Sequence, residues 1–95
     1  MRFEYDHRKA LTNLRKHDVS FDEAESVFDD TLSAVIKDEL HSINEVRWLI
    51  IGMSDFDRLV IVSFTQRDDN IRLISARKPT KQEVKEYEEG KRRRD

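Results

Sequence analysis

The chain has 95 residues, of which 40% are charged and 37% hydrophobic, and its formal net charge is −2. This length suits one domain with a single core, and the small net charge gives no overall signature of nucleic-acid binding. Cysteine is absent, which excludes disulfides, thiol catalysis and cysteine-ligated zinc. Even the longest unbroken apolar runs, such as Trp48–Ile51, are too short to span a membrane, and the first six residues lack the apolar segment of a secretory signal. We therefore expect a soluble, cytoplasmic protein.

The N-terminal third is predicted to form a short strand and two helices. Residues 2–5 alternate in polarity, which indicates a strand at the edge of a sheet. Asp6 is a suitable N-cap for a helix over residues 7–17. A second helix should follow Ser20, because Ser20 and Glu23 have the spacing of a capping box. This second helix is predicted to end at the two aspartates that precede Thr31.

The remaining chain is predicted to be mainly a sheet followed by one helix. Residues 31–36 favour a strand, and three further apolar runs follow, at residues 46–52, 59–64 and 71–76. The three runs are connected by polar turns, which predicts an antiparallel arrangement.

The C-terminal helix is predicted to begin after Pro79. Thr80 and Glu83 form a second capping box, so we expect a short helix over residues 81–89 that ends at Gly90. Residues 1–90 would then make one domain, and residues 91–95 a basic C-terminal tail.

Alternation along the three central strands sorts their side chains onto two faces. The even-numbered positions are apolar except for Arg72, so this face should pack against the helices. The odd-numbered face carries Arg47, Ser63, Ser75 and Arg77. Hairpin turns near Asp55 and between Asp68 and Asp69 would place Arg47 opposite Ser63, and Ser63 opposite Ser75, unless a β-bulge shifts the register.

Arginines above small hydroxyl side chains suit the recognition of a phosphate. A planar guanidinium can donate two parallel hydrogen bonds to a phosphate, and serines leave room for a nucleic-acid backbone to approach. The alternative is that Arg47 pairs with Glu45 or a nearby aspartate and only covers the sheet, because exposed ion pairs are common.

Several segments in this order resemble a known family. They are Lys16-His17-x-Val19-Ser20-Phe21, Glu45-x-Arg47, Ile51-Gly52 and Ile74-Ser75-Ala76-Arg77. The chain resembles the BrnT toxins of type II toxin–antitoxin pairs over residues 3 to 87. The family usually has glycine where this chain has Asp18. Glycine suits a left-handed residue after a helix, and aspartate tolerates that conformation at some cost.

The resemblance implies a RelE-like fold and an RNA-cutting activity. We expect an α+β protein whose antiparallel sheet has two N-terminal helices packed on one face and a short C-terminal helix. The implied activity is that of an endoribonuclease that arrests growth. The implied partner is a cognate BrnA-like antitoxin with a ribbon-helix-helix DNA-binding domain. This domain would bind operator DNA, and the toxin–antitoxin complex would thereby repress its own operon.

Metal-free RNA cleavage uses the 2′-hydroxyl of the substrate as nucleophile, so a site needs a proton acceptor and cations at the phosphate. We assign the cationic role to Arg77 and Arg47. Two candidates for the base remain open: His17, which could instead meet free carbonyls at its helix end, and Glu45, which could instead pair with Arg47. His41, among acids in a loop, is interpreted as solvent-exposed.

Further RNA contacts are assigned to four residues: Lys16, Arg67, Ser63 and Ser75. The three histidines lack the tight spacing of a metal site, so we expect neither a metal nor another cofactor. Two alternatives to the enzyme stay open. One is a non-catalytic binding module that only holds an antitoxin in an operon-repressing complex, and the other is a plain RNA-binding domain.

Overall fold

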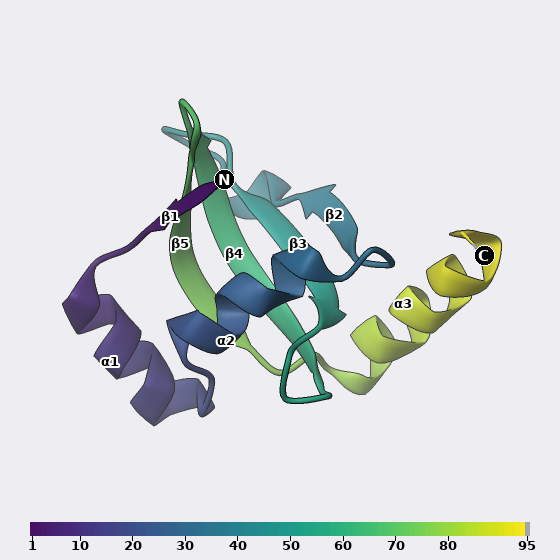
Figure 1. Ribbon diagram of the computed structural model, residues 1–95. Helices are drawn as coiled ribbons and strands as arrows, with labels where there is room; N and C mark the ends of the chain where they lie inside the picture. The colour runs from purple at the N-terminus through teal and green to yellow at the C-terminus, as the bar shows by residue number, and fades with distance from the viewer. Residues whose placement is uncertain (95) are drawn as a thin grey trace.

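The structure is a computed structural model that describes residues 1–94, with the side chains of residues 1–90. Three α-helices and five strands follow one another along the chain, with two short 3₁₀ helices between them (Figure 1). In chain order they are β1 (Arg2–Glu4), α1 (His7–His17), α2 (Phe21–Ser26), η1 (Val27–Asp29), β2 (Ala34–Lys37), η2 (Glu39–His41), β3 (Trp48–Met53), β4 (Leu59–Arg67), β5 (Asn70–Arg77) and α3 (Lys81–Arg94). None of the helices in this part of the chain is long and apolar enough to cross a membrane.

The strands form one five-stranded sheet in the order β1-β5-β4-β3-β2. The three central strands pair antiparallel, as predicted, and β2 extends them at one edge. The N-terminal strand lies at the other edge, as predicted, but it runs parallel to β5. The sheet is therefore mixed where an antiparallel one was expected. β1 and β5 are joined by residues 5–69 rather than by a tight turn, so their connection does not require them to run antiparallel. The α+β class is confirmed.

The two N-terminal helices cover one face of the sheet, which we call the packed face. Figure 1 shows α2 crossing in front of the strands, with α1 beside the lower part of β5 and α3 extending to the right, past the β2–β3 side of the sheet. The main core lies beneath α2, where side chains from helix and sheet are almost fully buried. It comprises Val19, Phe21, Ala24, Val27, Ile50, Val60, Val62, Phe64, Ile71, Leu73 and Ala76. The opposite side is the open face.

The predicted N-caps of α1 and α2 are confirmed, but the Glu23 side chain bonds Ser54 and Arg58 instead of completing the capping box at Ser20. Asp6 caps α1 by accepting hydrogen bonds from the backbone N–H groups of Arg8 and Lys9, at 2.8 and 3.3 Å. Ser20 Oγ accepts from Glu23 N at the start of α2, at 3.0 Å. Asp18 ends α1 in the left-handed conformation, with φ of 58°, and its N–H donates to the Leu14 carbonyl. Aspartate thus occupies the left-handed position at which the resemblance implied glycine.

A β-bulge in β5 changes which residues share a face. Ser63 pairs with Ser75, as predicted, but the next residue, Phe64, pairs with Leu73, so Ile74 is the extra residue. Beyond the bulge the alternation is reversed. Leu73 and Ile71 therefore join the packed face. Arg72 was placed on the packed side by simple alternation, which is wrong: it pairs in register with Thr65 and lies on the open face.

The predicted position of Arg47 opposite Ser63 is also wrong. Ser63 pairs with Leu49, and Arg47 lies just before the start of β3. The reason is the hairpin loop between β3 and β4, which is centred on Phe56 rather than Asp55. Moving the centre of a hairpin by one residue shifts every cross-strand partner by two residues. Arg47 therefore stays on the same face but no longer lies opposite Ser63.

The C-terminal helix is longer than predicted, because it continues through Gly90 to Arg94. A glycine ends a helix most readily when it adopts a positive φ, and no described glycine does so. The predicted basic tail, 91–95, therefore begins as the end of α3, and Asp95 lies outside the described residues. At the other end of α3 the predicted capping box is complete. Glu83 N donates to Thr80 Oγ1, and Thr80 N donates to Glu83 Oε1.

Candidate functional site

A cavity of about 360 Å³ opens on the open face, where β3, β4 and β5 meet the η2 segment. We call it the open-face cavity. It combines two arginines, two serines and a histidine–aspartate pair with three aliphatic side chains. Its lining residues are Asp38, Leu40, His41, Arg47, Leu49, Ser63, Ile74, Ser75 and Arg77. Four residues that the sequence assigned to the site, namely Arg47, Arg77, Ser63 and Ser75, are thus brought together.

Arg47 is held by its backbone and leaves its charge unpaired. Its N–H donates to Ser42 Oγ at 2.9 Å, and its carbonyl accepts from Asp38 N at 2.8 Å. The guanidinium makes no ion pair with a carboxylate of the described residues, and its Nε is buried without a hydrogen-bond partner there. The expected alternative pairing with Glu45 does not form. A cation that is partly desolvated and unpaired attracts an anion strongly.

Arg77 is fixed at the end of β5 by Glu83 at the start of α3. Its Nη1 and Nη2 donate to the two carboxylate oxygens of Glu83, at 2.9 and 3.0 Å. The guanidinium lowers the pKa of Glu83 from 4.5 to about 2, while the same contact raises the pKa of Arg77. Because Nε and part of Nη remain unused within the described residues, Arg77 keeps donors that a ligand in the cavity could accept.

His41 is solvent-exposed, as its position among acidic loop residues indicated, but it also lines the open-face cavity. Its Nδ1 lies 2.9 Å from Asp38 Oδ2. The imidazole is 64% exposed and the carboxylate 14% exposed, so the ring reaches into solvent while the acid stays behind it. An ionised carboxylate only accepts, so Nδ1 carries the proton and Nε2 is left to accept one. The spacing Asp38-x-x-His41 in one short turn was the available sequence signal.

Ser63 and Ser75 form the floor of the cavity. They are direct cross-strand partners on β4 and β5, and both are partly buried. Their small side chains leave the space between the two arginines open, as the sequence suggested.

The other predicted site residues lie elsewhere. Lys16 and His17 end α1, do not line the open-face cavity, and make no hydrogen bond to a described side chain. Arg67 lies at the far end of β4, and its guanidinium pairs with Glu45 at 3.4 Å. Glu45 lines a neighbouring hollow together with Arg47 and His41 rather than the cavity itself. Of the two sequence-based candidates for the base, His17 therefore lies away from both arginines, whereas Glu45 lies beside Arg47 but outside the cavity.

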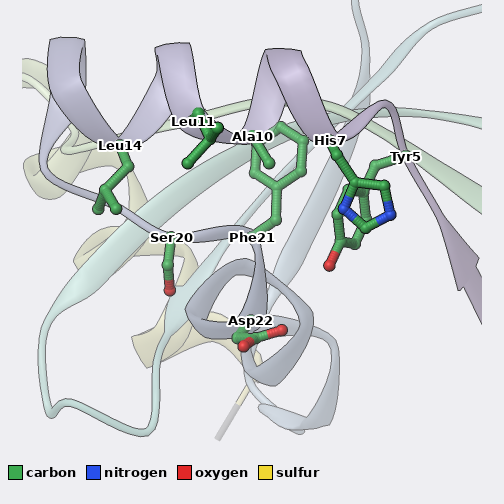
Figure 2. Close-up of a pocket in the computed structure, with 8 residues that line it drawn as sticks. All are labelled: Tyr5, His7, Ala10, Leu11, Leu14, Ser20, Phe21 and Asp22. Atoms are coloured by element: carbon green, nitrogen blue, oxygen red, sulfur yellow. The ribbon is translucent and has the colours of Figure 1, made fainter.

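A second cavity, of about 280 Å³, lies between α1 and α2 and has a different character. Figure 2 shows Leu11 and Leu14 of α1 directed into the space above Ser20, the Phe21 ring beside Ala10, and His7 and Tyr5 at one end. Its lining is mainly apolar and contains no lysine or arginine. This α1–α2 groove therefore lacks the cations that a phosphate site requires. Among the residues the structure describes, no group of three or more His, Asp or Glu side chains could hold a metal ion.

Comparisons with known proteins identify the family and the fold of the chain. Residues 5–83 match the family model of BrnT, described as the ribonuclease toxin of a type II toxin–antitoxin system. A crystal structure of the Brucella abortus ribonuclease toxin BrnT has the same fold, with a TM-score of 0.66 and 21% sequence identity, over 85% of this chain and 99% of that chain. A search of curated proteins gave no match. Since the family model spans most of the chain, the protein belongs to the BrnT family of ribonuclease toxins of type II toxin–antitoxin systems.

Proposed function

We propose that this chain is a metal-independent endoribonuclease that cuts RNA at the open-face cavity. The observation that carries the proposal is the meeting of Arg47, Arg77 and the His41–Asp38 pair in one cavity. The protein would act in the cytoplasm, arrest growth by cutting RNA, and be neutralised by a BrnA-like antitoxin whose ribbon-helix-helix domain binds operator DNA for the complex.

The chemistry follows from the roles that each side chain can take. His41 Nε2 accepts the proton of the 2′-hydroxyl, while Asp38 holds the ring and stabilises the imidazolium that forms. The 2′-oxygen then attacks the adjacent phosphorus. Arg47 and Arg77 donate to the phosphate oxygens, where negative charge increases in the transition state. The leaving 5′-oxygen takes a proton from solvent, which gives a 2′,3′-cyclic phosphate and a 5′-hydroxyl.

The test is cleavage of a labelled RNA oligonucleotide by the purified chain in the presence of EDTA. We expect cutting of the RNA and none of the matching DNA, which lacks the nucleophile. Arg47→Ala should lower kcat/KM by about 10² to 10³, the usual cost of removing one transition-state donor. His41→Gln should lower it by about 10² to 10⁴, the usual contribution of a general base.

Matched histidine variants identify the base. His7→Gln and His17→Gln should cut like the wild type, because neither residue lines the cavity. If His17→Gln is inactive and His41→Gln is active, the assignment of the base is wrong although the activity stands. If the wild type leaves RNA intact in the absence of antitoxin, the ribonuclease proposal fails, and the non-catalytic binding module becomes the better description.

A further inference from the structure

Three large aliphatic side chains stand in solvent near the open-face cavity, and one of them, Leu40, also lines it. Leu40 is 83% exposed, Ile43 is 85% exposed and Ile36 is 62% exposed. We call these three residues the η2 patch, since they lie in and around the η2 segment and the strand before it. Exposure of this extent in neighbouring aliphatic residues marks a surface that binds another molecule.

The patch is continuous with the cavity. Ile36 of β2 is the direct cross-strand partner of Leu49 on β3, and Leu49 lines the cavity together with Leu40. Leu40 and Ile43 in turn line the neighbouring hollow beside Arg47. A molecule seated on the patch would therefore reach Arg47 without leaving the surface.

The chemistry of the patch favours a protein over RNA. Bases are bound by aromatic or guanidinium planes on which they stack and by polar groups at their edges, and isoleucine and leucine offer neither. Aliphatic side chains beside a polar rim are typical of the centre of a protein interface.

The unpaired charge of Arg47 indicates which side chain the docked protein contributes. The Arg47 guanidinium has no carboxylate partner among the described residues, and its buried Nε has no acceptor there. A carboxylate from a docked chain would supply that acceptor in the cavity. Such a pair would add specificity to apolar contacts on the patch.

We propose that the η2 patch is the docking site of the antitoxin, and that the docked segment places an acidic side chain against Arg47. The segment carries apolar residues for Ile36, Leu40 and Ile43, and its carboxylate takes the place of the RNA phosphate. Neutralisation is then direct competition for the cavity. This inference rests on the proposed function, because it assigns the antitoxin a place at the same site.

The test measures the affinity of the purified antitoxin, encoded in the same operon, by calorimetry. The double variant Ile36→Ser/Ile43→Ser should bind at least about tenfold more weakly, since buried aliphatic anchors commonly contribute this much or more. Arg47→Ala should also weaken binding, and added salt should reduce the difference between Arg47→Ala and the wild type. Leu11→Ser is the matched control, because Leu11 is 57% exposed but belongs to the α1–α2 groove.

The outcomes separate this inference from the ribonuclease proposal, because affinity is measured without RNA. If the double variant binds as tightly as the wild type, or if Leu11→Ser alone weakens binding, the docking site is wrong even when the chain cuts RNA. If the double variant loses affinity, the docking site stands even when the chain proves inactive. Circular dichroism of each variant should match the wild type, since all three isoleucine or leucine changes are at exposed positions.

Discussion

Two arginine–glutamate pairs in this molecule have the same chemistry and opposite surroundings. Glu23 of α2 and Arg58 of the β3–β4 loop meet on the helix-covered side, where the Glu23 side chain is only 1% exposed. Arg77 and Glu83 meet beside the open-face cavity, where the side chains are 37% and 28% exposed. In both pairs the guanidinium lowers the pKa of the carboxyl group.

The difference lies in what else each pair binds. The Glu23 carboxylate also accepts from Ser54 Oγ at 2.6 Å, and Arg58 donates to the Asp18 carbonyl at 2.7 Å. The buried pair therefore ties α2, the end of α1 and the β3–β4 loop together, and leaves little for a ligand to bind. The exposed pair ties only β5 to α3 and holds a guanidinium at the cavity. Burial makes one pair a structural link, and exposure makes the other available for function.

The largest expected effect is on the buried pair. Glu23→Ala should lower the free energy of unfolding by about 3 kcal/mol, because it leaves the partner cation and Ser54 without their acceptor. Urea unfolding measures this. Asp22→Ala, at an exposed position of the same helix turn, should change stability by only about 0.5 kcal/mol. Equal effects of the two variants would contradict a structural role for the buried pair.

A smaller effect is expected at Asn13, which joins α1 to the free edge of β5. Its side chain is 6% exposed. It donates to the carbonyls of Val19 and Ala76 at 2.9 and 2.8 Å, and accepts from Ala76 N at 3.0 Å. β1 pairs with β5 only as far as Arg72, so this amide takes the place of a neighbouring strand.

Asn13→Ala should therefore lower the free energy of unfolding by about 2 kcal/mol, since three buried backbone groups lose their partner. Thr12→Ala is the control, because Thr12 bonds only within its own exposed helix turn. Chemical denaturation of both variants decides the matter. A loss at Asn13 no larger than at Thr12 would show that the edge of β5 needs no such partner.

The sequence predicts most reliably those features that depend on interactions between residues close together along the chain. The caps at Asp6 and Ser20, the left-handed Asp18 and the capping box at Glu83 each depend on a few consecutive residues, and all of them form. The core runs and the arginine–serine combination were also predictable, because alternation along a strand determines the face of each side chain.

The features that sequence missed depend on relations between distant segments. The bulge at Ile74 is a property of the β4–β5 pair and moves Arg72 to the other face. Glu45 pairs with Arg67 rather than Arg47 because the β3–β4 loop is centred one residue later than assumed. His41 could be assigned to the cavity only once the η2 segment was known to fold over β3 and β5.

The smallest expected effect is the pH dependence of the exposed pair. The folded pKa of Glu83 is about 2, against an ordinary value of 4.5. A lowered pKa means that the pair contributes its full stability above about pH 4.5 and loses it as pH falls toward 2. Because the pair is partly exposed, we expect a contribution of only about 1 kcal/mol.

Glu83→Gln removes the titrating group at this position while leaving every other carboxylate in place. The difference in unfolding free energy between wild type and variant should therefore be constant from pH 7 to about pH 5, and should then shrink toward pH 2. The Glu23–Arg58 pair titrates in both proteins, so its larger contribution cancels in this difference. A difference that stays constant down to pH 2 would show that Arg77 is not held by an ionised Glu83. Arg77 would then be free to turn away from the cavity, and the proposed role of the exposed pair in holding Arg77 there would lose its structural basis.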